Sequence, residues 1–341
     1  MSLDLATKPA PSAQTGSAAA PVGLLRRVTD VIFQRSAELV GISLLLLVLL
    51  SLYALYDQSL FTGKSIIMLS AQFLPLIIAS MAQAIVMLTG GIDLSIGAVL
   101  SLVMSIFAVL AGTGVGVVGA ILIALSVGML VGLLNGALVA FARLPPIIVT
   151  LAASFLWSGV TLVILPQPGG LIPADLIRAY NKGWNGLALG VVALIIVLAL
   201  WKYIARSRFG LSIYAVGGNE HGAFASGIRV RSVTLWAYGL SGLFTGIAGI
   251  ALTIQTGTGD ANLGVPYTLN TIAASILGGV SFLGGIGRMR GVVMGALVVA
   301  ILPILLLFIG VSPFYQLVVQ GGVLIIAFAS KYVLTRGKQA V

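Results

Sequence analysis

The chain has 341 residues, of which 59% are hydrophobic and only 8% are charged, against about 25% charged in an ordinary soluble domain. This composition excludes a soluble globular fold, and several apolar runs approach the ~20 residues that a helix needs to cross a bilayer. The net charge of +10 does not indicate nucleic-acid binding, because the basic residues lie beside the apolar runs and form no separate basic domain. With no cysteine and one histidine, no metal site is expected.

Residues 1–36 are predicted to form a cytosolic N-terminal segment that is disordered. Its first part, to about residue 22, is rich in Ala, Pro, Ser and Thr and has few large apolar residues to stabilise an ordered state. The first long apolar run begins only at Leu39, and no cleavage pattern of a signal peptide follows it. Arg26-Arg27 is compatible with a twin-arginine signal, but the favoured reading is that these charges hold the N-terminus in the cytosol.

Residues 37–335 are predicted to form an all-α polytopic membrane domain, followed by a cytosolic tail at 336–341. With the N-terminus inside, most of the 18 basic residues fall on the cytosolic side, and only Lys64, Arg178 and Lys182 lie outside. This asymmetry predicts ten spans with both termini cytosolic. The predicted spans are 39–56, 65–88, 96–112, 117–140, 147–165, 187–204, 233–255, 269–282, 292–308 and 315–332.

A short internal echo indicates two inverted half-repeats. Residues 135–139, Asn-Gly-Ala-Leu-Val, resemble residues 294–298, Met-Gly-Ala-Leu-Val. The echo pairs the fourth predicted span with the ninth, and five crossings between them would invert the second half in the membrane. Inverted repeats commonly place a transported substrate's route at their interface. A chance match among abundant Gly, Ala, Leu and Val is the alternative.

Asp93 is the acidic residue most closely bracketed by apolar runs, within residues 89–97, Thr-Gly-Gly-Ile-Asp-Leu-Ser-Ile-Gly. A carboxylate at the bilayer centre costs about 2.5 to 3.5 kcal/mol on insertion scales. Asp93 is therefore predicted to be a gate residue beside a wet pathway or to cap the third span. Both readings remain open at this point.

The longest polar interruption lies at 205–232 and is predicted to be a cytosolic loop that contacts a soluble partner. Basic residues flank and occupy it. Residues 217–220, Gly-Gly-Asn-Glu, and 226–228, Ser-Gly-Ile, resemble a segment of the permease subunits of bacterial sugar ABC importers of the ribose/arabinose/xylose type. In that family the segment lies against the ATPase. The ATPase-coupling residues that the resemblance implies are Gly217, Gly218, Asn219, Glu220, Ser226 and Gly227.

The same resemblance extends to residues 89–97, 143–151, 267–270 and 284–287. It implies a permease subunit that moves a monosaccharide across the bacterial inner membrane by alternating access. The implied partners are a cytosolic ABC ATPase, a periplasmic sugar-binding protein and a second permease subunit, identical or paralogous. ATP would be bound by the ATPase, so no cofactor is expected in this chain. Family members carry a basic residue where Phe224 stands, and this departure puts a symmetric homodimer in doubt.

Few polar side chains other than Ser and Thr lie in the apolar runs. Amide hydrogen bonds and aromatic stacking bind an uncharged sugar, so Gln83, Asn135, Asn270 and Trp157, together with Asp93, are the candidates for the translocation path or gate. For each residue the alternative is a hydrogen bond that only holds helices together.

Other functions are less favoured by the sequence. Within the importer class, the cargo would alternatively be a nucleoside or a sugar-like signal molecule. An ion-coupled secondary transporter is the alternative of another class, and it would need buried ionisable residues, for which Asp93 is the only candidate. An enzyme is not expected, because the acids are scattered and His221 has no catalytic constellation around it.

Overall fold

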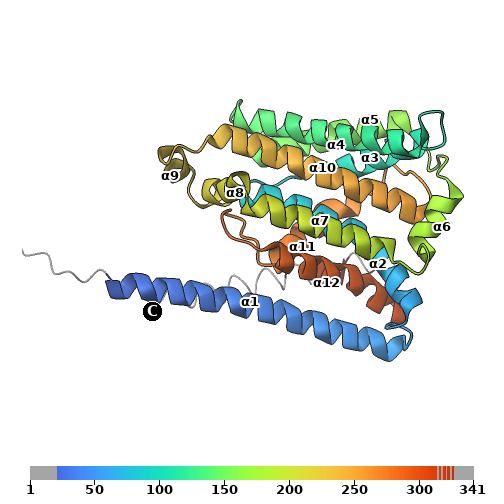
Figure 1. Cartoon of the computed structure of the whole chain (residues 1–341), viewed down its shortest axis with the longest axis horizontal. Coiled ribbons are helices and arrows are strands. Elements are labelled where there is room, and N and C mark those ends of the chain that lie inside the picture. Colours follow the sequence, from blue (N-terminus) through green and yellow to red (C-terminus); the bar gives the residue numbers. More distant parts are fainter. Residues whose placement is uncertain (1–20, 313–314, 316–317, 320, 323–324, 326–341) are drawn as a thin grey trace, which may run out of the picture.

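The computed structural model describes residues 21–312 together with residues 315, 318–319, 321–322 and 325. In this part of the chain every named element is an α-helix (Figure 1). Seven helices are long and apolar enough to cross a membrane by length and composition. They are α1 (Pro21–Tyr56), α2 (Gly63–Leu88), α4 (Gly116–Ala140), α5 (Pro146–Ile164), α7 (Leu189–Arg206), α10 (Val230–Thr256) and α12 (Met289–Phe308).

Two further apolar helices are shorter, α3 (Ile96–Leu110) and α11 (Val265–Leu277). These nine helices follow the first nine predicted spans in order, so the all-helical class is confirmed. The tenth predicted span, 315–332, lies mostly outside the described residues, as do residues 1–20 and the tail 336–341.

The structure differs from the sequence prediction at the N-terminal segment. α1 is already helical from Pro21, where the sequence analysis expected disorder through residue 36. A proline is well tolerated in the first turn of a helix, because the N–H that it lacks would have no helical partner there. Leu25, Val28 and Ile32 also recur at helical spacing, a signal that composition alone does not register.

Helices α2 and α10 form the centre of the bundle and are the most buried of the seven long helices. They pack on each other, and each also packs on two helices from the other half of the chain: α10 on α3 and α4, α2 on α11 and α12. Gly91, just after α2, lies against Tyr238 in the third turn of α10. The end of α2 therefore meets the beginning of α10, and the two helices run antiparallel.

Small residues explain the close packing of α4 on α10. A Cβ at Gly132 would overlap the carbonyl oxygen of Tyr238, and one at Gly128 would stand 2.7 Å from the carbonyl oxygen of Gly242. Glycines spaced four apart thus let the two backbones touch, as in other tightly crossing membrane helices.

Three short helices lie at the ends of the bundle. α8 (Arg208–Gly218) and α9 (Glu220–Ala225) lie at one end, and α6 (Ala174–Lys182) lies at the other (Figure 1). The Tyr180 hydroxyl of α6 donates to the Ala71 carbonyl in α2 over 3.2 Å, which ties α6 to the bundle. The candidate site described next is built at the end that carries α8 and α9.

Candidate functional site

The predicted central loop is in fact largely helical. Within residues 205–232 the chain forms α8 and α9, separated only by Asn219. Ser207 caps α8, with its side-chain oxygen accepting the Gly210 N–H, and Asn219 caps α9, with its side-chain oxygen 2.9 Å from the Gly222 nitrogen. Such side-chain caps satisfy backbone donors that a helix start leaves unpaired. α8 carries Phe209, Ile213 and Val216 at helical spacing, a signal that the polar character of the stretch obscured, whereas α9, with six residues, is too short to show a period.

The end of α9 is shaped by Ser226 and Gly227. Gly227 has φ +81°, the left-handed conformation that glycine adopts without strain. Its N–H donates to the Phe224 carbonyl (2.9 Å) and the Ile228 N–H donates to the Ala223 carbonyl (3.0 Å), the bonding pattern of a Schellman helix end. Asn219 and Gly227 therefore fix the start and the end of α9. Glu220 and His221, in its first turn, are exposed.

Glycines join α8 to the end of α2. A Cβ at Gly217 would overlap the carbonyl oxygen of Leu88, the last residue of α2. The same carbonyl accepts the Gly285 N–H over 3.0 Å, and a Cβ at Gly284 would stand 2.7 Å from the Gly90 nitrogen. Three parts of the chain thus meet backbone to backbone at this point. At Gly218, by contrast, the nearest atom to an added Cβ lies 4.0 Å away.

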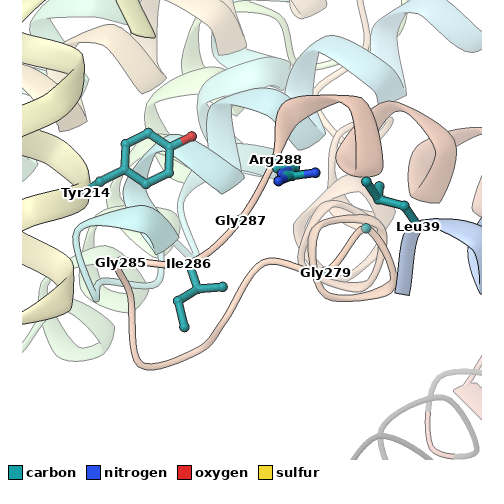
Figure 2. A pocket seen from close by; sticks show the side chains of 8 residues that line it. Leu39, Tyr214, Gly279, Gly285, Ile286, Gly287 and Arg288 are labelled. Carbon is teal, nitrogen blue, oxygen red and sulfur yellow. The ribbon is translucent and has the colours of Figure 1, made fainter. Parts of the chain in front are cut away.

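Beside this junction lies a small cavity of about 80 Å³ (Figure 2). Tyr214 of α8 and Arg288, just before α12, line it together with the loop that carries Gly285. The cavity is too small for a sugar, because ligand pockets usually enclose about 300 to 1,000 Å³.

Asp93 lies in the loop between α2 and α3, with 4% of its surface exposed. Its Oδ1 accepts two hydrogen bonds from Ser95, one from the backbone N–H (2.8 Å) and one from the hydroxyl (2.6 Å). The Ser95 hydroxyl oxygen in turn accepts from Nδ2 of Asn135 on α4 over 2.9 Å. Burial raises the pKa of the Asp93 carboxyl, and the hydrogen bonds from Ser95 act in the opposite direction.

The backbone on either side of Asp93 is also held. With its amide oriented to satisfy both partners, Gln83 of α2 donates to the Asp93 carbonyl (2.9 Å) and accepts from the Asp93 N–H (3.3 Å). The Thr150 hydroxyl of α5 accepts the Leu94 N–H at 3.0 Å. Side chains from α2, α4 and α5 thus fix the loop. The buried Asp93 carboxylate closes a turn by accepting the N–H of Ser95, two residues later.

The candidate path residues fall into two groups. Gln83, Asp93 and Asn135 are buried and belong to one hydrogen-bonded cluster, which we call the Asp93 cluster. Trp157 on α5 and Asn270 on α11 are half-buried, and in the described part of the chain no hydrogen bond joins their side chains to this cluster. The grouping of the first three depends on contacts between helices, and no spacing in the sequence predicts it.

A second aspartate loop, which the sequence analysis overlooked, matches the first. Residues 256–264 repeat the Thr-Gly, Asp and Gly of residues 89–97 at the same spacing. Asp260 accepts the Asn262 N–H at 2.8 Å, as Asp93 accepts that of Ser95. The two loops follow α2 and α10, which are antiparallel, so they lie toward opposite ends of the bundle. The signal was present in the sequence as this nine-residue pattern.

The similarity between residues 135–139 and 294–298 is not part of the repeat that relates the two aspartate loops. Asn135 contacts the loop after α2 through Ser95. Gly295, in the second copy, packs on Gly278, which lines the small cavity at the same junction. Both copies of the echo thus lie toward the same end of the bundle, whereas equivalent positions of an inverted pair must lie toward opposite ends.

Comparison with known proteins places the chain in a family of transport-system permeases. The model of the family described as "Branched-chain amino acid transport system / permease component" matches residues 65–328. The ribose import permease protein of Escherichia coli (strain K12) is 35% identical over 83% of this chain and 90% of its own. That of Bacillus subtilis is 35% identical over 87% and 92%, and the D-allose transport system permease protein of E. coli is 34% identical over 81% and 86%.

The chain is also similar to the galactose/methyl galactoside import permease protein of Salmonella typhimurium, with 31% identity over 85% of this chain and 92% of the relative. No solved structure matches the chain. Since the family model and these relatives each span most of the chain, it belongs to this family of transport-system permease components, multi-pass proteins of the bacterial inner membrane.

Proposed function

We propose that this chain is the permease subunit of an ABC importer that moves a monosaccharide across the inner membrane by alternating access. The observation that carries the mechanism is the backbone contact between α8 and the end of α2, because it joins the ATPase-coupling segment directly to the loop that holds Asp93. The cargo class follows from relatives that are named as permeases for ribose, allose and galactose. The chain is a transport subunit and not an enzyme.

The full assembly is part of the proposal. A cytosolic ABC ATPase would bind and hydrolyse ATP, a periplasmic sugar-binding protein would deliver the sugar, and a second permease subunit, identical or paralogous, would complete the pore. In the described part of the chain, the α8–α9 segment offers the exposed charged and polar surface that a soluble partner needs, with Glu220 and His221 on it.

The proposed topology has ten spans, two inverted halves and both termini in the cytosol. The two aspartate loops support the inversion, because they match in sequence and lie toward opposite ends of the bundle. The crosswise packing of α2 and α10 supports it as well, since each central helix packs on the third and fourth membrane helices of the opposite half. α8 and α9 would then face the cytosol, and α6 would face the periplasm.

The Asp93 cluster is proposed to hold the α2–α3 loop in one of two positions during transport, and Trp157 and Asn270 are proposed to line the sugar's route. A nucleoside or a sugar-like signal molecule remains the alternative cargo. An ion-coupled transporter is the less favoured class, because the Asp93 carboxylate is buried and already accepts two hydrogen bonds from Ser95.

Reconstitution tests the function. The chain is placed in proteoliposomes with its ATPase and binding protein, and uptake of radiolabelled ribose, allose and galactose is measured with and without ATP. We expect uptake of one of these sugars that requires ATP and both partners. Uptake that needs only a proton or sodium gradient would assign the protein to the secondary transporters instead.

A further inference from the structure

A groove of about 1020 Å³ opens at the end of the bundle that carries α9. One wall is formed by α9, and another by the connection between α4 and α5, where Arg143 lies. The glycine pair Gly90 and Gly91, immediately before the Asp93 turn, lines the groove as well. An occupant of this groove would therefore contact both the coupling segment and the loop that holds Asp93.

The groove is strongly basic. Arg143, Arg229 and Arg231 line it, and all three are exposed. Glu220 is the single acidic residue among its lining residues. In the described part of the chain the only ion pair joins Arg178 to Asp175, so no carboxylate there neutralises the three guanidinium groups. Guanidinium groups bind carboxylates with particularly favourable geometry, so the groove is suited to an acidic occupant.

Tyr238 connects the groove to the loop that holds Asp93. This side chain lines the groove and is fully buried, and its hydroxyl packs against Gly91, near Asp93, with no hydrogen-bond partner among the described residues. Because Tyr238 lines the groove and packs on Gly91, an occupant that displaces this side chain would act on the loop that holds Asp93.

The two terminal segments of this chain do not have the charge expected of an occupant of the groove. Residues 326–341 carry Lys331, Arg336 and Lys338 and no acid, and residues 1–20 carry one acid, Asp4, and one base, Lys8. A second copy of the chain has only 8 acidic residues, which are scattered along the sequence. The occupant is therefore a different molecule, and the position of the groove against α9 makes it continuous with the proposed ATPase-coupling surface.

We propose that an acidic segment of the cytosolic ATPase enters this groove and pairs with Arg143, Arg229 and Arg231. The inference rests on the proposed function and specifies how the partner is recognised. Because Gly90 and Gly91 line the inner part of the groove, entry or withdrawal of the segment acts directly on the loop that holds Asp93. The ATPase would thus contact this loop without relying on α9 alone.

The first test compares two sets of substitutions in the full-length chain in lipid nanodiscs. Arg143→Gln, Arg229→Gln and Arg231→Gln remove the three charges of the groove. Lys202→Gln and Arg290→Gln remove two exposed charges at the same end that lie outside the groove and outside residues 205–232. Each exposed ion pair contributes little on its own, so we expect the loss of all three together to weaken ATPase binding about tenfold. The effect should be largest at low salt, because salt screens exposed charges. The control should bind like the wild type, and equal effects of the two sets would overturn the proposal.

The second test identifies the occupant. The chain has no cysteine, so Thr234→Cys, which places a thiol in the groove, can carry a photocrosslinker on an otherwise unlabelled protein. With ATPase present, we expect a crosslink to a peptide rich in Asp and Glu. A crosslink to phospholipid alone, or to no ATPase peptide while the ATPase is bound, would refute this inference but leave the importer assignment intact. Failure of the wild-type chain to bind the ATPase at all would refute the proposed function itself.

Discussion

Gly217, in the last turn of α8, lies directly against the main-chain carbonyl of Leu88, the last residue of α2. The two residues belong to different halves of the chain, and no side chain separates their backbones. Leu88 also accepts the Gly285 N–H over 3.0 Å. Movement of α8 would therefore be transmitted to the end of α2 and to the loop that follows it.

This contact predicts opposite results for two adjacent glycines. Gly217→Ala places a methyl group where the Leu88 oxygen lies, and overpacking of this kind typically costs about 1 to 3 kcal/mol. Gly218→Ala adds a methyl group whose nearest neighbour is 4.0 Å away, so it should be neutral. Thermal unfolding in detergent and sugar-stimulated ATP hydrolysis of the assembly should both be impaired only by the first change. Equal behaviour of the two variants would show that the glycine junction does not couple the elements.

Asp93 substitutions separate a structural role from an ion-binding role. In Asp93→Asn the side-chain oxygen still accepts the Ser95 N–H, so we expect most transport activity to remain. In Asp93→Ala both hydrogen bonds from Ser95 are lost, and a buried unpaired group costs about 1 to 3 kcal/mol. Uptake and thermal stability should therefore fall in the alanine variant. Complete loss of uptake in the asparagine variant, with stability unchanged, would favour ion coupling through the carboxylate.

Glu220 is exposed at the start of α9 and is expected to contact a basic residue of the ATPase, separate from the acidic segment that pairs with Arg143, Arg229 and Arg231. Glu220→Lys should leave the amount of protein in the membrane normal, because the residue makes no buried contact. It should weaken ATPase association and abolish uptake, whereas Glu220→Gln, which removes the charge without reversing it, should have a smaller effect. Co-purification and uptake assays measure both. Wild-type transport by the lysine variant would show that Glu220 is only a solvated surface residue.

Single cysteines test the topology, because the native chain contains none. Ser226→Cys, at the end of α9, should react with a membrane-impermeant maleimide only after spheroplasts are permeabilised. Asn262→Cys, in the loop before α11, is also exposed and should react in intact spheroplasts, which makes it the matched control. The reverse pattern would invert the proposed orientation, and labelling of both residues from outside would contradict the number of spans.

The sequence by itself determined the fold class and the order of the membrane helices. An apolar run in a bilayer has to satisfy its backbone hydrogen bonds internally, so run length is enough to predict a helix. The resemblance of residues 217–228 likewise identified the family that the comparisons then established. The match between the loops of Asp93 and Asp260 could also have been predicted, because residues 256–264 repeat the pattern of residues 89–97. Asp260 was treated as an isolated acid in an outer loop, so the two loops were not compared.

Only the tertiary structure decided how these parts meet. Gln83, Asp93 and Asn135 form one cluster because α2 and α4 bring distant side chains to the same loop, and no local spacing encodes that convergence. The local pattern also gave no sign of α9, which has only six residues and is bounded by the Asn219 cap and the Gly227 helix end. Gly217 and Gly218 are identical in type and adjacent in sequence, yet only one faces Leu88. The physical reason is that burial and contact distance depend on packing between elements, whereas the sequence specifies residue type and local hydrophobicity.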